Sequence, residues 1–274
     1  MSEPASHAPD VLILGCGYTG AAVARLALSR GLRVLGSVRS GESAEPLAAQ
    51  GIPTLVRPAL DPSIAAHVDS QTHVVVAFPP DRNTDLCIAG ALAGAGAITY
   101  VSSTGVYGDR TGVIDDHTPL PDPLNSRSAR LLAGENAYRP FGATILRSPA
   151  IYGRDRGLHC RVLRGEHRIP GDGSHTLSRI HVEDLAALIL ATRTVRGETF
   201  VVGDLEPTPH IDVVRFICEN YGLPLPPFAP LEELPDSLRA NRAIDPRRAL
   251  GRLEVTLRYP SYREGMAKPR AALC

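Results

Sequence analysis

Lysine is almost absent from this chain, and several other features are missing with it. Of the 29 lysine and arginine residues only Lys268 is a lysine, which excludes any mechanism that needs a lysine earlier in the sequence. No apolar run approaches the ~20 residues of a membrane-spanning helix. The formal net charge is zero, so the overall charge does not indicate binding to nucleic acid or to an anionic membrane. The sequence contains no internal repeat and no low-complexity tract.

Cysteine and histidine show no spacing that is typical of a metal site. The five cysteines are scattered and never form Cys-x-x-Cys, and the nine histidines include no His-Glu-x-x-His pattern. An odd number of separated cysteines is typical of reduced thiols. Residues 1–10 are polar and carry no signal-peptide pattern. We therefore expect a cytoplasmic protein without a metal site, with a flexible tail over residues 1–10.

A glycine-rich turn follows the first apolar run of the chain. The run at residues 11–14 leads into Gly15-Cys16-Gly17-Tyr18-Thr19-Gly20, and a helical pattern and a second strand-like run come next. This order is the context that a dinucleotide-binding fingerprint requires. We expect Gly15 to permit the tight turn, Gly17 to let backbone approach a pyrophosphate, and Gly20 to let the helix pack on the strand. The helix N-terminus would bind the phosphates.

The end of the second strand bears on the choice of cofactor. An acidic residue there usually binds the ribose 2′-hydroxyl of NAD, whereas a cation meets the 2′-phosphate of NADP. Here the strand ends with Arg39 and Ser40, and the first acids, Glu42 and Glu45, come later. A planar guanidinium suits a phosphate, although Arg39 is also compatible with a solvated surface residue in so arginine-rich a chain. We expect NADP as the cofactor, with NAD as the less favoured alternative.

Strand and helix patterns alternate through the first half of the chain. The expected strands span residues 11–14, 33–38, 53–56, 73–78, 97–102 and 143–147. The expected helices span residues 19–30, 43–50, 62–68, 82–95 and 124–138. Several of the strands are continuous apolar runs, which suit a parallel sheet that is covered on both faces. We therefore predict an α/β fold with a doubly wound parallel sheet of the Rossmann, NAD(P)-binding type.

The second half of the chain has a different pattern. After the polar, basic residues 153–180, the expected elements are a helix at 182–192, a strand at 199–202, a helix at 211–221, a proline-rich loop at 223–235, and a short helix with an extended segment at 246–262. We expect residues 11–152 to form the nucleotide-binding core. Residues 153–274 are expected to form a small C-terminal substrate lobe, interleaved with the core and lying over its open rim.

Four motifs occur in a fixed order between residue 11 and about residue 205. They are Gly15-x-Gly17-x-x-Gly20, Val101-Ser102-Ser103-Thr104-Gly105-Val106-Tyr107-Gly108-Asp109, Leu146-Arg147-Ser148-Pro149-Ala150-Ile151-Tyr152-Gly153 and Arg179-Ile180-His181-Val182-Glu183-Asp184-Leu185-Ala186. In this order and spacing they resemble the extended short-chain dehydrogenase/reductase (SDR) superfamily, in its NAD-dependent epimerase/dehydratase branch.

The resemblance implies three catalytic groups, of which this chain has one. A serine hydrogen-bonds the substrate oxygen, a tyrosine acts as general acid and base, and a lysine four residues later lowers the pKa of the tyrosine and holds the nicotinamide ribose. By position in its motif the serine is Ser103. The tyrosine and lysine are expected near residues 125–130, where neither occurs. Arg130 stands nearest to the lysine position and Ser126 nearest to the tyrosine position, with a slip of one residue allowed.

Other side chains are less suited to proton transfer. Tyr107 and Tyr152 are expected to be structural, and Tyr138 lies well over a turn too late on the predicted helix. His181 is a natural proton carrier near neutral pH, so catalysis by His181 is one hypothesis, but a helix cap or a substrate contact is favoured. The chain is therefore identified as an atypical extended SDR that lacks the Tyr-x-x-x-Lys pair.

The basic segment bears on the substrate. Residues 154–181 carry six arginines and four histidines against three acidic residues. Arginines would bind an anionic substrate through bidentate hydrogen bonds, and related enzymes often hold a nucleotide-sugar diphosphate under this stretch. A solvated loop explains the charges equally well. No aromatic interleaving accompanies the arginines, so we expect no nucleic acid as a partner.

The candidate site residues fall into three groups. The catalytic candidates are Ser103 and Arg130. The cofactor-binding candidates are Gly15, Gly17, Tyr18, Thr19, Gly20, Arg39, Ser40, Phe78, Pro79 and Pro149. The substrate-binding candidates are Arg154, Arg179 and His181.

Three functions are compatible with these residues. The favoured one is an NAD(P)-dependent oxidoreductase or epimerase/dehydratase-like enzyme that acts on a small anionic or sugar-nucleotide substrate. The second is a catalytically silent NADP(H)-binding sensor or partner-binding protein, and the third is a non-redox enzyme that uses the nucleotide pocket for another ligand. We expect a monomer or homodimer whose partner is a small molecule, with no membrane association.

Overall fold

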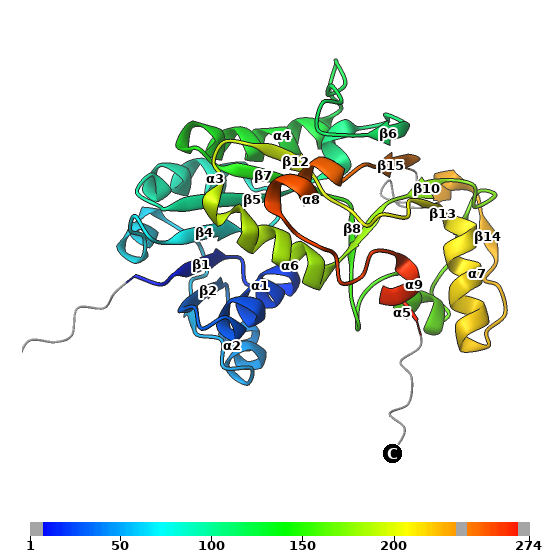
Figure 1. Cartoon of the computed structure of the whole chain (residues 1–274), viewed down its shortest axis with the longest axis horizontal. Helices are drawn as coiled ribbons and strands as arrows, with labels where there is room; N and C mark the ends of the chain where they lie inside the picture. Colours follow the sequence, from blue (N-terminus) through cyan, green and yellow to red (C-terminus); the bar gives the residue numbers. More distant parts are fainter. Residues whose placement is uncertain (1–7, 234–239, 268–274) are drawn as a thin grey trace, which may run out of the picture.

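The computed structural model describes residues 8–233 and 240–267. Its centre is a sheet of seven parallel strands in the order β12-β7-β5-β4-β1-β2-β3 (Figure 1). The strands in chain order are β1 (Val11–Leu14), β2 (Val34–Val38), β3 (Thr54–Val56), β4 (His73–Val76), β5 (Ala97–Ser103), β7 (Thr144–Ser148) and β12 (Thr199–Val201). The predicted doubly wound α/β fold is thereby confirmed, and the six strands expected in the first half of the chain are all present.

Helices cover both faces of this sheet. Successive side chains of its buried strands point to opposite faces, so both faces are apolar and need cover. Val11 and Ile13 point into one apolar cluster, and Leu12 and Leu14 point into the other. The first cluster lies under α1 (Tyr18–Ser29), α2 (Gly41–Ala48), α6 (Val182–Ala191) and α8 (Arg247–Leu253). The second lies under α3 (Arg82–Ile88), α4 (Ser126–Tyr138) and the 3₁₀ turns η1 (Pro62–His67), η2 (Ala89–Leu92) and η4 (Arg139–Phe141). The expected helix at 82–95 is therefore an α-helix followed by a 3₁₀ turn.

The C-terminal half contributes both to the sheet and to a separate lobe. Although β12 and α6 lie beyond residue 153 in the sequence, they pack into the core. The lobe contains α5 (Leu158–Leu163), α7 (His210–Tyr221) and α9 (Tyr262–Gly265), which Figure 1 shows grouped to the right of the sheet. The domain boundary at residue 152 stays a prediction.

Short strands in the lobe were not expected from the sequence. A four-stranded sheet pairs β13 (Thr208–Pro209), β10 (Thr176–Leu177), β15 (Arg242–Ile244) and β6 (Gly112–Ile114). Two further pairs join β8 (Ala150–Tyr152) to β11 (Arg179–His181) and β9 (Ile169–Pro170) to β14 (Phe228–Ala229). The prediction that residues 223–235 form only a loop was therefore wrong for β14 and for the 3₁₀ turn η6 (Leu231–Glu233). Residues 234 and 235 lie outside the described residues.

The expected N-terminal tail is only partly described. Residues 1–7 lie outside the described part of the chain. Asp10, by contrast, accepts hydrogen bonds from Arg33, at 2.8 Å from its backbone nitrogen and at 2.9 Å from Nη2. The tail predicted over residues 1–10 is thus held at its last residue. No helix within residues 8–233 and 240–267 is both long and apolar enough to cross a membrane.

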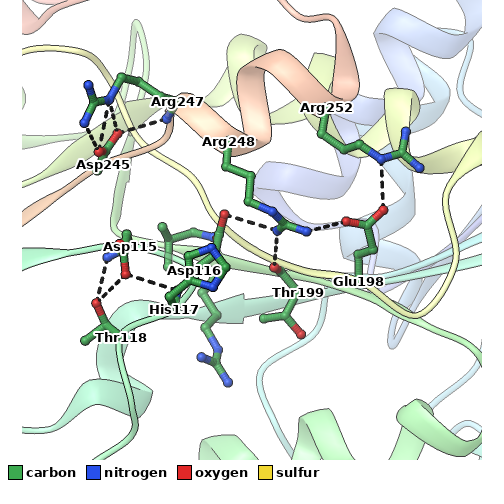
Figure 2. A network of polar contacts seen from close by, with 12 residues as sticks. Asp115, Asp116, His117, Thr118, Glu198, Thr199, Asp245, Arg247, Arg248 and Arg252 are labelled. Atoms are coloured by element: carbon green, nitrogen blue, oxygen red, sulfur yellow. Dashed lines mark hydrogen bonds and ion pairs between the residues drawn. The ribbon is translucent and has the colours of Figure 1, made fainter.

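A polar network protects the edge of the large sheet at β12 (Figure 2). An edge strand exposes backbone N–H groups that need partners. The backbone nitrogen of Val201 donates to the Asp116 carboxylate, which also accepts from Arg248 of α8 at 3.2 Å. Arg248 additionally pairs with Glu198 and lies over the ring of Phe200, 4.7 Å from its centroid. The loop after β6 and helix α8 are thereby fixed against the same strand.

Burial favours the uncharged form of the histidines that lie within the fold. Burial lowers the pKa of His73 and of His210 to about 3, and that of His167 and of His181 to about 4. Because an unfolded histidine titrates near 6.5, the unfolded chain binds more protons than the folded chain between pH 4 and 6.5. Each of these groups therefore stabilises the fold at neutral pH and loses that contribution as the pH falls through 6.5.

We expect the free energy of unfolding to fall by about 3 kcal/mol between pH 6.5 and pH 5. Asp85 and Asp204 oppose the histidines, because burial raises their pKa values to about 6 and about 7. At pH 5 the unfolded chain then binds about two more protons than the folded chain. Urea unfolding at three pH values measures the slope, and Asp204→Asn should steepen it. A stability that is constant or rises toward pH 5 would contradict the assignment.

Candidate nucleotide and substrate site

The glycine turn lies between β1 and α1, and its geometry matches the three roles expected of its glycines. Gly15 has φ +87°, and a Cβ there would lie 2.8 Å from the Phe78 backbone nitrogen. A Cβ on Gly20 would lie 2.7 Å from the Gly15 carbonyl oxygen and 2.9 Å from Ile13 Cγ2. A Cβ on Gly17 would meet nothing within 4 Å. Gly15 and Gly20 are therefore required by packing, whereas Gly17 faces open space that a ligand can approach.

Helix α1 begins without a side-chain cap. Gly17 is its N-cap residue, and the first turn contains no acidic residue. The first intrahelical bond runs from Ala21 N to Gly17 O at 2.8 Å, so the N–H groups of Tyr18, Thr19 and Gly20 point out of the helix end. Such an end has free donors and a positive dipole, which together suit an anion.

A cavity of about 540 Å³ opens at the carboxyl ends of β1, β2 and β4. Of the predicted cofactor residues, Gly15, Gly17, Arg39, Phe78 and Pro79 line it. It lies where the strand order reverses between β1 and β4, the usual ligand position in such sheets. Five of the ten predicted cofactor residues, from three separate segments, therefore meet at this cavity, whereas Tyr18 lines a different one.

The structure adds a second cation that the sequence analysis missed. Arg57 lines the same cavity as Arg39, and both side chains are exposed. In the parallel pair β2–β3, Val38 is opposite Val56, so each arginine is the first residue after its strand. The carboxyl ends of parallel strands meet at one edge of the sheet. Pairing the second strand with the third in this register would therefore have identified Arg57.

Ser40 and Pro149 do not line this cavity. The Ser40 hydroxyl caps α2, where it accepts from Ser43 N at 3.4 Å. Ser43 itself lines the cavity. Pro149 lines a neighbouring cavity on the substrate side of the site. The cofactor contacts predicted for Ser40 and Pro149 stay predictions.

Ser103 ends β5 and faces α4. Its Oγ accepts from Gly105 N at 3.1 Å, which leaves its own O–H free to donate. A Cβ on Gly105 would lie 3.3 Å from that Oγ and 3.7 Å from Nε of Arg127. Ser103 Oγ and Arg127 Nε thus lie on the same side of Gly105, each within 4 Å of the position that a Cβ would take.

Arg130 and Ser126 lie elsewhere on α4, and both are exposed. Arg130 is one turn before Gly134, where a Cβ would lie 3.3 Å from Pro80. Residues four apart share a helix face, so Arg130 lies on the same side of α4 as Gly134. The ribose contact predicted for Arg130 stays a prediction.

The three tyrosines near the site have structural partners, as expected for Tyr107 and Tyr152. The hydroxyl of Tyr107 accepts from Arg147 at 3.0 Å, that of Tyr138 donates to Asp85 at 2.9 Å, and that of Tyr152 donates to the Ser261 carbonyl at 3.3 Å. All three rings are buried, and burial raises their pKa values. The tyrosines are therefore poorly placed to exchange protons with a substrate.

A second cavity of about 480 Å³ lies between Thr104 and the lobe. Arg179 lines it, and four more arginines share the wall: Arg156, Arg161, Arg164 and Arg242. The substrate contact predicted for Arg179 stays a prediction. Within the described residues, Arg179 Nη1 and His210 Nδ1 are buried without a hydrogen-bond partner. The charge of Asp204 acts on Arg179, but a buried guanidinium nitrogen without a hydrogen-bond partner is costly unless an anion or water satisfies it.

Arg154 and His181 line a third cavity of about 420 Å³ beside Tyr18. His181 caps α6, since its Nδ1 accepts from Glu183 N at 3.2 Å. Its ring lies 3.7 Å from that of Tyr259, centroid to centroid. The observed cap agrees with the favoured structural role of His181.

Comparison with known proteins places this geometry among related folds. No family model matches the sequence. A curated Streptomyces protein named 3-diazoavenalumate denitrifying reductase is 27% identical over 178 residues, which are 57% of this chain and 59% of that protein. The match thus spans less than two thirds of the relative's length.

Solved structures match over almost the whole chain. A functionally unknown conserved protein from Silicibacter pomeroyi DSS has a TM-score of 0.80 and 29% identity, over 93% of this chain and 96% of that chain. A Methylobacillus flagellatus structure described as an NAD-dependent epimerase/dehydratase has a TM-score of 0.71 and 26% identity, over 93% and 95%. MoeE5, in complex with UDP-glucose and NAD, has a TM-score of 0.75 and 22% identity, over 94% and 96%. In its fold the chain is therefore similar to extended SDRs of the NAD-dependent epimerase/dehydratase type.

Proposed function

We propose that this protein binds NADP(H) and acts as a reductase on a small anionic substrate. The observation that carries the proposal is the uncapped N-terminus of α1, which meets two arginines at the ends of β2 and β3 in one cavity. An uncapped helix end suits a pyrophosphate, and paired guanidinium groups suit an additional phosphate.

The described residues fit each charged part of such a dinucleotide. The N–H groups of Tyr18, Thr19 and Gly20 would hold the pyrophosphate, since nothing fills the space in front of Gly17. Arg39 and Arg57 would hold the 2′-phosphate that distinguishes NADP from NAD. When bound in its reduced form, the cofactor would supply a hydride. NAD remains the alternative, and it is the dinucleotide in the MoeE5 structure.

The second cavity supports an anionic substrate. Five arginines line its wall, against one carboxylate, that of Asp155. Arg179 is 4% exposed, and its Nη1 and the Nδ1 of His210 offer unused hydrogen-bonding capacity. A carboxylate or phosphate group would satisfy both the charge and the free donors.

The relatives favour a redox reaction without fixing its substrate. The Streptomyces relative is by name a reductase, and MoeE5 was solved with UDP-glucose. A diazo compound and a nucleotide sugar are both candidate substrate classes for the present chain. The missing tyrosine and lysine instead favour the second function, a catalytically silent NADP(H)-binding protein.

Two measurements test the proposal. Fluorescence titration of the purified chain with NADPH and NADH should show saturable binding of NADPH and weaker binding of NADH. NADPH oxidation is then followed with a panel of anionic carbonyl and diazo compounds. Turnover that is lost in Ser103→Ala supports the reductase, and NADPH binding without any turnover supports the silent protein. Binding of neither nucleotide would refute both functions.

A further inference from the structure

The α4 position that faces Ser103 is occupied by an arginine. Gly105 lies between the two elements, and a Cβ there would be 2.9 Å from Leu131 Cδ1, 3.3 Å from Ser103 Oγ and 3.7 Å from Arg127 Nε. Arg127 and Leu131 are four residues apart and share one face of the helix. These two residues therefore have the spacing of the absent Tyr-x-x-x-Lys pair and lie next to the retained serine.

A second guanidinium reinforces the positive charge at this point. Arg242 of β15 is 8% exposed and donates from Nη1 to the Thr104 carbonyl at 2.9 Å. Burial lowers the pKa of Arg242, and the nearby charge of Arg127 lowers it further. Asp109 is the carboxylate that acts in the opposite direction. Arg127 and Arg242 thus repel each other across the end of β5, and an anion placed between them would relieve that repulsion.

Two hydroxyl groups near Ser103, those of Ser128 and Tyr107, already have hydrogen-bond partners. Ser128 is buried and donates to the Gly105 carbonyl at 3.0 Å. Tyr107 is buried beneath the turn and hydrogen-bonded to Arg147. An arginine stays protonated throughout the physiological pH range and so cannot act as a general acid. The groups at this position can hold negative charge, but they lack a usual proton donor.

We propose that Arg127, with Ser103 and Arg242, forms an oxyanion-binding site at the reacting end of the substrate pocket, in place of the family's tyrosine and lysine. The proposal rests on the proposed reductase function. The substrate class is a hydride acceptor in which the reduced carbon carries an oxygen atom. This oxygen is negatively charged in the substrate or becomes so during the reaction. Arg127 is assigned as a catalytic residue that touches this oxygen.

The chemistry balances without an acid from the protein. When a reduced nicotinamide donates a hydride to a carbonyl carbon, a C–H bond forms and the π-electron pair of C=O moves to oxygen. The guanidinium groups and the Ser103 O–H stabilise this oxyanion, as preorganised donors do in other oxyanion holes. Water supplies the proton after the hydride has been transferred. The substrate gains two electrons, and the nicotinamide loses them.

The decisive test measures anion binding in protein without nucleotide. The amide of Gly105 donates to Ser103 Oγ, so its ¹H–¹⁵N resonance reports an anion at that position. Titration with sodium acetate should shift this resonance saturably in the wild-type chain. Arg127→Gln should weaken the apparent affinity at least tenfold, in line with the loss of one charge-assisted hydrogen bond.

Two matched variants control for the loss of a positive charge. Arg130→Gln removes an exposed arginine from the same helix, and Arg215→Gln removes one from α7. Arg215→Gln should leave the acetate affinity at Gly105 within about twofold, since a screened charge at a distance contributes little. Arg130→Gln, one turn along the helix from Arg127, should weaken the acetate affinity less than Arg127→Gln does. The proposal is overturned if acetate does not shift Gly105, or if Arg130→Gln rather than Arg127→Gln removes the shift. Because no nucleotide is present, this result is independent of the NADPH titration.

Restoring the family's pair provides the complementary measurement. In Arg127→Tyr/Leu131→Lys the acetate shift at Gly105 should weaken, and reduction of neutral aldehydes with NADPH should rise above the wild-type rate. Circular dichroism checks that the double variant is folded, because Leu131 is buried. A folded double variant that still binds acetate as the wild type does would contradict the assignment of Arg127.

Discussion

Arg39→Asp is expected to reduce the affinity for NADPH about 100-fold while changing the affinity for NADH only a few-fold. A charge-assisted hydrogen bond contributes about 1.5–3 kcal/mol, and the new carboxylate also repels a 2′-phosphate. The same carboxylate can accept a hydrogen bond from the 2′-hydroxyl of NADH, which offsets the loss for that nucleotide. Fluorescence titration with both nucleotides measures the ratio of the two dissociation constants.

Arg57 provides the internal check on this expectation. Both arginines line the same cavity from the ends of paired strands, so Arg57→Gln should also weaken NADPH more than NADH. Because the two guanidinium groups would share one phosphate, the effects of Arg39→Gln and Arg57→Gln should not be additive. Equal losses for NADPH and NADH in both variants would assign these arginines to the pyrophosphate or to no ligand, and the proposed NADP preference would fail.

The parallel sheet was predictable because its signals are local. Several strands are continuous apolar runs, such as Val74, Val75 and Val76, and all three are fully buried. Glycines mark the turn after β1, and a left-handed Gly222 ends α7 where the helix was expected to end. The lobe sheet escaped prediction because strands such as β10 and β13 contain two residues each. Two residues show no periodicity, and their partners are far away in the sequence.

The candidate site shows the same division between local and long-range signals. The glycine turn, Arg39 and Ser103 follow directly from motifs next to strand ends. The choice between Arg127 and Arg130 does not, because two residues three apart on a helix lie only about 60° from each other around its axis. Arg57 and Arg242 depend on which strands pair, and no local pattern contains that information.

A buried ion pair holds the strand ends that carry the site. Glu135 of α4 is fully buried and accepts from Arg147 Nε and Nη2 at 2.9 and 2.8 Å and from Ser102 Oγ at 2.7 Å. Burial alone would raise the pKa of Glu135, but the hydrogen bonds from Arg147 overcome this effect and hold the pKa below its usual value. Arg147 also donates to Tyr107 at 3.0 Å. The pair therefore joins α4, β5 and β7 directly beneath Ser103.

Arg147→Met is expected to reduce the free energy of unfolding by about 3–5 kcal/mol, because it leaves the carboxylate of Glu135 buried with fewer partners. For a chain of this size the midpoint of thermal unfolding should fall by about 10 °C, as measured by calorimetry. The double variant Glu135→Leu/Arg147→Met should recover most of the loss, since removing both charges leaves no uncompensated group. Arg139→Met removes the 2.7 Å contact with Glu135 from a side chain that is 35% exposed, and should cost much less. If the double variant is no more stable than Arg147→Met, the loss comes from packing around Tyr107 rather than from an unpaired buried charge.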